Sequence, residues 1–183
     1  MAALTAVPVA LAAGALVFWQ LNRATDPGPT LPKVQATGAV QMGAPALSDN
    51  ATVACRALLS QLPDALGDRP RRPVTAGPEQ NAAYGDPPIT LSCGTGAGPS
   101  VPPMDDVSWL NGVCWYAAPD KTGTTWYTLD RVVPITVRIP AAYQRTAEWA
   151  IDFSAPIAGS VRSVTADRLL PGCQPDTVAS PAN

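Results

Sequence analysis

The sequence predicts an α+β fold: a small, mainly antiparallel sheet with one or two packed helices, preceded by a single N-terminal transmembrane helix. An uncharged apolar run opens the chain. Behind it lie short runs of β-branched and aromatic residues between turn residues, flanked by apolar residues at helical spacing. A helix, a strand, a hairpin, further strands and a second helix in this order predict a mainly antiparallel α+β domain.

The N-terminal run, residues 2–21, carries no charged side chain. At about 1.5 Å per residue it would span about 30 Å, the thickness of a bilayer core. Phe18 and Trp19 near its end suit a membrane–water interface. We therefore predict a transmembrane anchor over residues 1–23, with membrane lipid as its partner. A cleaved signal peptide and a buried core helix are the alternatives.

The charge beside this run opposes an external domain. Arg23 lies on its C-terminal side, and no Lys or Arg precedes it in the sequence. The positive-inside rule places Lys and Arg on the cytoplasmic flank of a transmembrane helix. We therefore expect a short basic segment upstream of Met1.

Residues 24–47 are rich in Pro and Gly and have little apolar periodicity. Such a composition predicts a solvated, semi-extended tether, with an ordered strand inside it as the alternative.

The folded domain is predicted over residues 48–163. Ser48, Asp49 and Asn50 are good N-cap residues, and apolar residues at helical spacing follow them. Pro63 interrupts the last turn. These signals predict a helix over residues 51–61.

The polar, proline-rich residues 67–88 are predicted to form no regular element. A strand is expected over residues 89–93, followed by a loop to Pro103. Asn111-Gly112 between two apolar runs is the strongest short-range hairpin signal, so a hairpin is expected over residues 107–116. Further strands are expected in residues 124–129 and 132–139.

The last part of the domain, residues 143–161, is expected to be helical mostly in its second half, with Ser154 as the N-cap. Pro134 places the start of the preceding strand at an edge or a bulge. Residues 164–183 are predicted to form a C-terminal tail that is attached to the domain at Cys173.

The four cysteines predict on which side of the membrane the domain lies. They include no C-x-x-C pair, and the chain has no His to complete a zinc site, so we expect no metal and no cofactor. An even number of cysteines behind an apolar N-terminus favours disulfides on the extracytoplasmic side of the cell membrane. All three pairings are open from the sequence. We favour Cys55–Cys93, joining the first helix to the first strand, and Cys114–Cys173, joining the tail to the sheet.

Four motifs carry a family resemblance: Cys55-Arg56-Ala57-Leu58, Tyr84-Gly85-Asp86-Pro87-Pro88-Ile89, Leu91-Ser92-Cys93-Gly94 and Trp109-Leu110-Asn111-Gly112-Val113-Cys114-Trp115. Together they resemble an uncharacterised family of actinobacterial membrane-anchored or secreted proteins, domain of unknown function 3515. The resemblance covers roughly residues 48–159. It implies an N-terminal apolar segment and an external domain, and it implies no activity and no catalytic residues.

Composition excludes several functions. The net charge of −2 predicts no nucleic-acid partner, and the lack of His excludes Ser-His-Asp and Cys-His catalysis within this chain. The Gly94–Gly98 run resembles a phosphate loop, but prolines follow it instead of a helix, so we interpret it as a plain loop. Asp105 and Asp106 are neighbours whose side chains would point apart in an extended segment, and Asp86 is typical of a turn.

The candidate functional surface combines three groups of residues. The resemblance makes Tyr84, Gly85 and Asp86 the first choice, and Arg69, Arg71 and Arg72 form the densest basic cluster. The third group lies in the hairpin and comprises Trp109 and Asn111. Aromatic residues gather around it, either as an exposed platform for a sugar or peptide or as core: Trp109, Trp115, Tyr116, Trp126 and Tyr127.

These observations favour a non-catalytic binding or assembly domain, an accessory subunit of a membrane or cell-envelope complex with a protein partner. The alternative is an envelope glycan-modifying hydrolase that uses paired carboxylates drawn from Asp86, Asp105 and Asp106. A third hypothesis, a small-ligand sensor, requires an apolar pocket.

Overall fold

The computed structural model describes residues 15–20, 36–98, 106–170, 172 and 173. The chain divides into two compact units, Met1–Val34 and Gln35–Asn183. In the first unit, residues 15–20 are helical. Within the described ranges, no helix is long and apolar enough to cross a membrane. The rest of the predicted anchor, residues 1–14 and 21–23, lies outside the described residues.

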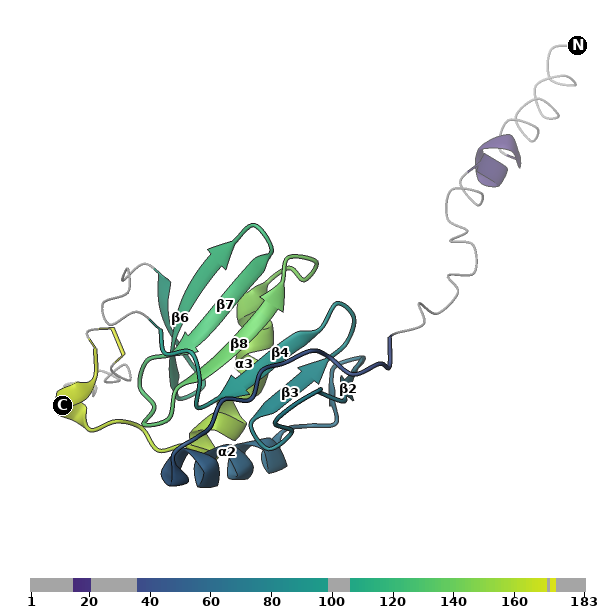
Figure 1. Cartoon of the computed structure of the whole chain (residues 1–183). Coiled ribbons are helices and arrows are strands. Elements are labelled where there is room, and N and C mark those ends of the chain that lie inside the picture. The colour runs from purple at the N-terminus through teal and green to yellow at the C-terminus, as the bar shows by residue number, and fades with distance from the viewer. Residues whose placement is uncertain (1–14, 21–35, 99–105, 171, 174–183) are drawn as a thin grey trace, which may run out of the picture. The chain divides into compact units, whose positions relative to one another are not determined.

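The second unit is an α+β domain built on an eight-stranded sheet with the strand order β1-β2-β3-β4-β8-β7-β6-β5 (Figure 1). Every neighbouring pair of strands is antiparallel, which confirms the predicted sheet. The strands are β1 Ala65–Leu66, β2 Arg69–Arg72, β3 Asn81–Tyr84, β4 Ile89–Cys93, β5 Val107–Leu110, β6 Val113–Asp120, β7 Gly123–Thr128 and β8 Ile135–Pro140.

The first helix of the domain confirms the prediction for residues 51–61. It spans α2, Asp49–Gln61, and Ser48 is its N-cap. The Ala51 backbone N–H donates to the Ser48 hydroxyl at 3.3 Å, which satisfies one of the free donors at the helix start. Its apolar side buries Leu58 and Leu59 in the hydrophobic core.

The hairpin prediction is also confirmed. Asn111 and Gly112 have φ angles of 45° and 82°, the left-handed conformations that a two-residue type I′ turn requires. Asn111 is exposed in this turn between β5 and β6. The predicted strand over residues 89–93 coincides with β4.

The prediction of no regular element in residues 67–88 is wrong, because β2 and β3 lie there. All four residues of β3 are buried, so the strand has no polar–apolar alternation to reveal it. Strand β2 is the second strand from the sheet edge, where Pro is uncommon, so its Arg-Pro-Arg-Arg sequence conceals it.

The predicted start of the second helix is wrong as well. Helix α3 spans Thr146–Ser160 and contains Ser154 and Pro156 in its interior. Ser154 is not an N-cap: it is buried, and its hydroxyl accepts a hydrogen bond from the Trp115 indole N–H at 3.0 Å. The helix continues past Pro156 because the packing of its buried residues stabilises it.

Residues 36–47, predicted as part of the tether, are extended and lie along the domain. Val40 forms a parallel β-bridge with Val74, and the Asn81 side chain donates to the Gly43 carbonyl at 2.9 Å. In Figure 1 this segment crosses in front of β3 and β4. These residues are ordered along the domain but form only this single bridge and no strand, and residues 24–35 of the predicted tether lie outside the described residues.

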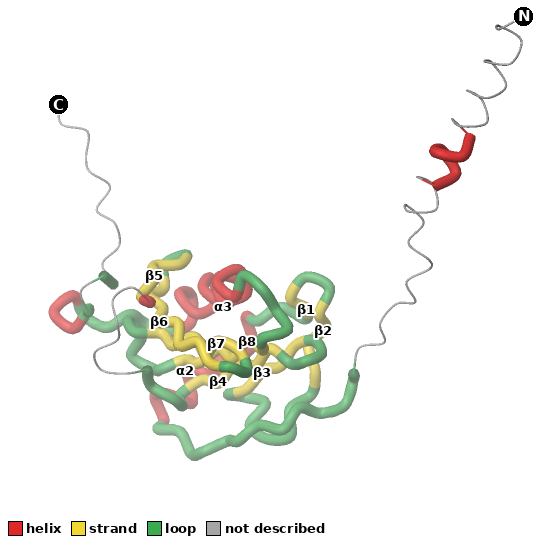
Figure 2. Tube along the Cα trace, turned by 90° about the horizontal axis from the view of Figure 1, so that it is seen from above, coloured by secondary structure: helices red, strands yellow, loops and turns green. Residues whose placement is uncertain are grey.

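The sheet has two different faces. Helices α2 and α3 contact each other, and α3 also contacts β5, β6 and β8. Figure 2 views the sheet from its end, with α3 on one side and residues 36–47 on the other. We call the side covered by the helices the helix face and the other side the open face. The helix face holds the hydrophobic core, in which Trp115, Phe153, Leu91, Ile135 and Ile157 are fully buried.

Candidate functional site

The two disulfides have the favoured pairing and fasten different faces. Cys55–Cys93 joins α2 to β4 within the hydrophobic core on the helix face. Cys114–Cys173 joins β6 to the C-terminal part of the chain on the open face, since Cys114 and Trp115 are consecutive strand residues on opposite faces. Both pairs are fully buried.

The Tyr84–Pro88 motif, the first choice from the sequence, forms the turn between β3 and β4. Tyr84 is fully buried, and its hydroxyl donates to the Pro63 carbonyl at 2.9 Å. This burial raises the pKa of Tyr84 to about 12. Gly85 has a φ of 70°, and the Asp86–Pro87 peptide bond is cis. The Tyr143 hydroxyl donates to the Pro87 carbonyl at 2.6 Å. The motif therefore shapes and fixes a turn.

The three arginines of the basic cluster bind different parts of the domain. The Arg69 guanidinium lies 4.5 Å from the centre of the Trp149 ring and 5.0 Å from that of Tyr143. Arg71 donates to the Leu59 carbonyl at 3.3 Å, and Arg72 donates to the Gly85 carbonyl at 2.9 Å. Because these contacts are internal, the cluster presents no joint cationic patch.

Asp86 and Asp106, two of the acidic residues proposed for hydrolysis, are too far apart to act as a pair. Asp86 lies in the β3–β4 turn, and Asp106 directly precedes β5. Four strand spacings separate β4 from β5 in the sheet, which corresponds to about 19 Å. Asp105 lies outside the described residues. The described part of the chain also holds no cluster of three metal-binding side chains.

The aromatic cluster divides between the two faces. Trp115 and Trp126 lie in the core on the helix face, with ring centres 6.4 Å apart. Trp109 pairs with Cys114, and Tyr116 pairs with Tyr127, which places these three aromatic side chains on the open face. Trp115 and Trp126 are therefore core residues, whereas Trp109, Tyr116 and Tyr127 are half-buried on the other face.

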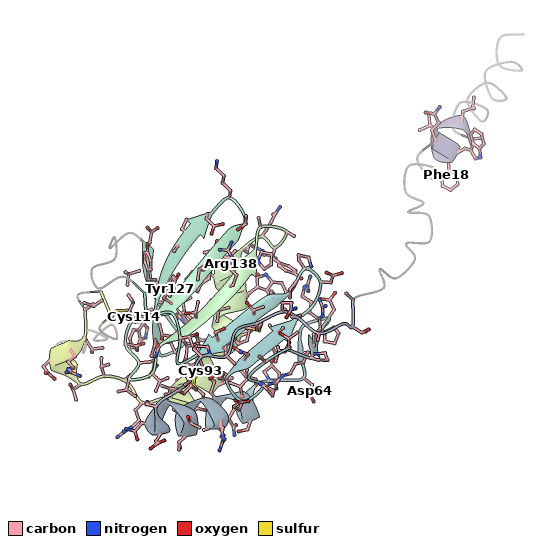
Figure 3. The ribbon with its side chains drawn as sticks, in the orientation of Figure 1. Phe18, Asp64, Cys93, Cys114, Tyr127 and Arg138 are labelled. Carbon is pink, nitrogen blue, oxygen red and sulfur yellow. A yellow bond between two sulfur atoms is a disulfide. The ribbon has the colours of Figure 1, made fainter. Side chains whose placement is uncertain are left out.

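A polar group lies beside these rings. Thr136 pairs with Tyr127, and Arg138, two residues further along β8, therefore projects from the same face. The Arg138 guanidinium donates to Thr125 at 2.9 Å and to the Asp120 carboxylate at 2.9 Å. Figure 3 shows the Tyr127 and Arg138 side chains on strands β7 and β8.

We call these side chains the open-face surface: Trp109, Tyr116, Thr125, Tyr127 and Arg138. All five are half-buried. The Tyr116 and Tyr127 rings are nearly parallel, with an interplanar angle of 22° and centres 6.1 Å apart. The hydrogen bond from Arg138 holds the pKa of Asp120 well below its usual range, with the Thr122 hydroxyl contributing in the same direction. The Asp120 carboxylate therefore stays ionised at neutral pH and forms an ion pair with Arg138.

The glycine-rich loop borders this surface. The Thr136 hydroxyl donates to the Gly96 carbonyl at 2.7 Å. A Cβ added at Gly98 would lie 2.9 Å from the Cβ of Tyr127, so the loop backbone packs directly against this strand. Residues 94–98 thus act as a rim, in agreement with the plain-loop interpretation.

A groove lies between α2, the β7–β8 connection and the end of α3. Its volume is about 620 Å³, and Leu47, Val53 and Val132 contribute apolar walls. Val53 is 71% exposed and Val132 is 51% exposed. Arg162 is the one charged residue that lines it. Ser48, Asn50 and Ser160 also line the groove, and this mixed lining indicates no particular small ligand.

A buried ion pair joins the ends of several elements. Asp130 is fully buried, and its carboxylate lies 3.5 Å from the Arg131 guanidinium. Burial raises the pKa of Asp130, while Arg131 opposes this shift. The same guanidinium donates to the carbonyls of Val161 and Gly112 and to the Ser163 hydroxyl. The pair thus connects the end of α3 to the hairpin turn.

The fold and surfaces define a small disulfide-bonded α+β domain. One sheet face carries the helices, and the other is crossed by residues 36–47 over β3 and β4 and holds half-buried side chains on β5–β8. The chain belongs to the family described as "Protein of unknown function (DUF3515)", whose model matches residues 5–166. No curated protein and no solved structure matches the chain.

The sequence alone did not single out Arg138, Thr125 or Asp120. The signal for Arg138 was present, because β8 alternates between buried and half-buried residues and Arg138 occupies a half-buried position. Its neighbours could not be identified, since the cross-strand register between β7 and β8 depends on tertiary pairing.

Proposed function

We propose that this chain is a membrane-anchored, extracytoplasmic, non-catalytic binding domain, and that the open-face surface is its recognition surface. The observation that carries the proposal is the placement of Trp109, Tyr116 and Tyr127 opposite the helices. A hydrophobic core already occupies the helix face. Aromatic residues on the other face add nothing to that core and are the side chains most often responsible for binding energy.

The location rests on two features of the sequence. Residues 2–21 are uncharged and long enough for a bilayer-spanning helix. Two disulfides suit an oxidising compartment, because reducing systems keep cytosolic thiols free.

A labelling experiment tests the location. Lys121 is exposed in the turn between β6 and β7, so Lys121→Cys offers one accessible thiol. A membrane-impermeant maleimide should label this variant in intact cells. The unmodified chain, whose described cysteines are all in disulfides, is the control and should stay unlabelled. Labelling of the variant only after lysis would contradict an external domain.

Photocrosslinking in native membranes tests the surface. The photoreactive residue p-benzoylphenylalanine would replace Tyr116 or Trp109 on the open face, or the exposed Arg56 on α2 as a matched control. We expect adducts of discrete mass at the two open-face positions and none at position 56. Equal adducts at all three positions, or adducts at position 56 alone, would exclude the open face as the recognition surface.

A further inference from the structure

The open-face surface has the composition of a saccharide site. We propose that it binds a neutral saccharide chain, with the sugar rings stacked along Trp109, Tyr116 and Tyr127. This inference rests on the proposed function and adds the chemical class of the ligand. The juxtaposition that supports it is a file of three aromatic rings beside a charge-neutral arginine–aspartate pair.

The file of rings crosses three adjacent strands. Trp109 is on β5, Tyr116 on β6 and Tyr127 on β7. Tyr116 pairs with Val107, so Trp109 lies diagonally from Tyr116, at about 7–8 Å. Tyr116 and Tyr127 are directly paired and nearly parallel, with centres 6.1 Å apart. A ligand that fits this file must present successive flat apolar faces. The C–H faces of linked pyranose rings meet this requirement, and aromatic side chains bury such faces well.

The polar groups beside the rings suit hydroxyl groups. Thr90, Arg138 and Thr125 follow one another across β4, β8 and β7 on the open face. The Arg138 guanidinium is already fixed by Asp120 and Thr125, both at 2.9 Å, so it would lose little freedom on binding. Hydroxyls that donate and accept can bond to a carboxylate, a guanidinium and threonine side chains alike.

The charge balance disfavours phosphate-rich ligands. Asp120 neutralises Arg138 at 2.9 Å, and the chain carries a formal net charge of −2. Nucleic acids and anionic lipid headgroups depend on uncompensated Lys and Arg. A neutral ligand needs no such excess of positive charge.

The backbone of this region disfavours an extended peptide. Peptides commonly bind a sheet by adding a strand at its edge, where backbone groups are free. Tyr116, Tyr127 and Arg138 lie on β6, β7 and β8, which are interior strands that pair on both sides, whereas Trp109 lies on β5 at the sheet edge. The backbone groups of these interior strands are already paired, so their open face offers only side chains. A saccharide can bind through side chains, whereas an added β-strand needs free backbone groups.

Calorimetric titration of the full chain tests the proposal. The protein would be held in a zwitterionic detergent without a sugar headgroup and titrated with cellohexaose, maltohexaose and chitohexaose. We expect at least one of these probes to bind with a Kd below about 1 mM. Tyr116→Ala and Tyr127→Ala should each weaken binding at least about tenfold, which corresponds to about 1.4 kcal/mol.

Two further variants make this result specific. Tyr116→Phe keeps the ring and should bind within about threefold of the parent chain, because stacking needs the ring rather than the hydroxyl. Val53→Ala, on the exposed side of α2, should leave binding unchanged. Binding that survives both alanine changes, or equal loss in Val53→Ala, would overturn the proposal.

The outcomes separate the ligand from the surface. If none of the three probes binds while photoadducts still form at positions 109 and 116, the open face recognises another class of partner and the saccharide proposal fails. If probe binding and open-face adducts are both absent, the proposed function fails with it.

Discussion

The helix face and the open face of the sheet differ most sharply at two consecutive residues, Trp115 and Tyr116. Trp115 is fully buried and donates to Ser154 of α3, whereas Tyr116 is half-buried and lies beside Tyr127 on the other side. One residue step along β6 thus separates core from surface. The comparison shows how a single aromatic-rich strand can supply both a core residue and a half-buried surface residue.

The largest expected effect is on the helix face. Trp115→Ala should lower the free energy of unfolding by about 4 kcal/mol, because it leaves a cavity in the core. It also removes the hydrogen-bond donor from the buried Ser154 hydroxyl. Tyr116→Ala is the matched control and should cost about 1 kcal/mol or less. Urea unfolding of the full chain in detergent measures both, and equal losses would contradict the division of roles.

A smaller loss is expected at the buried ion pair of Asp130 and Arg131. Arg131→Met should cost about 3 kcal/mol, because it leaves the buried Asp130 carboxylate without its counter-charge. Asp130→Asn is the control and should cost clearly less, since burial already raises the pKa of Asp130 and so favours its neutral form.

The pH dependence of the Arg131→Met variant follows from the same shift. A carboxyl whose folded pKa lies above its unfolded value binds protons more tightly in the folded state, so stability falls as pH rises through that window. Acidification from neutral pH should therefore restore part of the stability that Arg131→Met loses. A loss that does not change with pH would show that Asp130 is not the group responsible.

The smallest expected difference is between the stability costs of removing the two disulfides. The Cys55–Cys93 loop spans 38 residues and the Cys114–Cys173 loop spans 59. Loop entropy alone predicts a slightly greater cost for removing the longer loop. We expect the reverse, about 3 kcal/mol for the double alanine variant of Cys55 and Cys93 and about 2 kcal/mol for that of Cys114 and Cys173. Only the first pair belongs to the hydrophobic core. A larger cost for the second pair, in unfolding without reductant, would show that loop length dominates.

The sequence predicted the elements whose signals are local. The Ser48 cap, the Asn111-Gly112 turn and the alternating residues of β4 were sufficient for a helix, a hairpin and a strand. Strand β3 was missed because both of its sides are buried, and the start of α3 was misplaced because Ser154 binds Trp115. Both errors arise where tertiary packing overrides a local pattern.

The candidate site was predictable only in part. The aromatic concentration was visible, but its division between two faces depends on the register of β5, β6 and β7. The Tyr84–Pro88 motif and the three arginines were prominent in sequence, yet their hydrogen bonds and ring contacts fix the turn and the neighbouring strands. The motifs that were conspicuous in the sequence therefore have structural roles. The weaker signal, the alternation of buried and half-buried residues in β8, is the one that placed Arg138 on the surface.

Stability and ligand binding measured on one variant, Tyr116→Ala, test the central claim most directly. We predict that its free energy of unfolding stays within about 1 kcal/mol of the parent chain, as for a surface change. Its affinity for the saccharide that the parent chain binds should fall at least about tenfold. A large loss of stability with unchanged saccharide affinity would contradict the assignment of the open face to recognition.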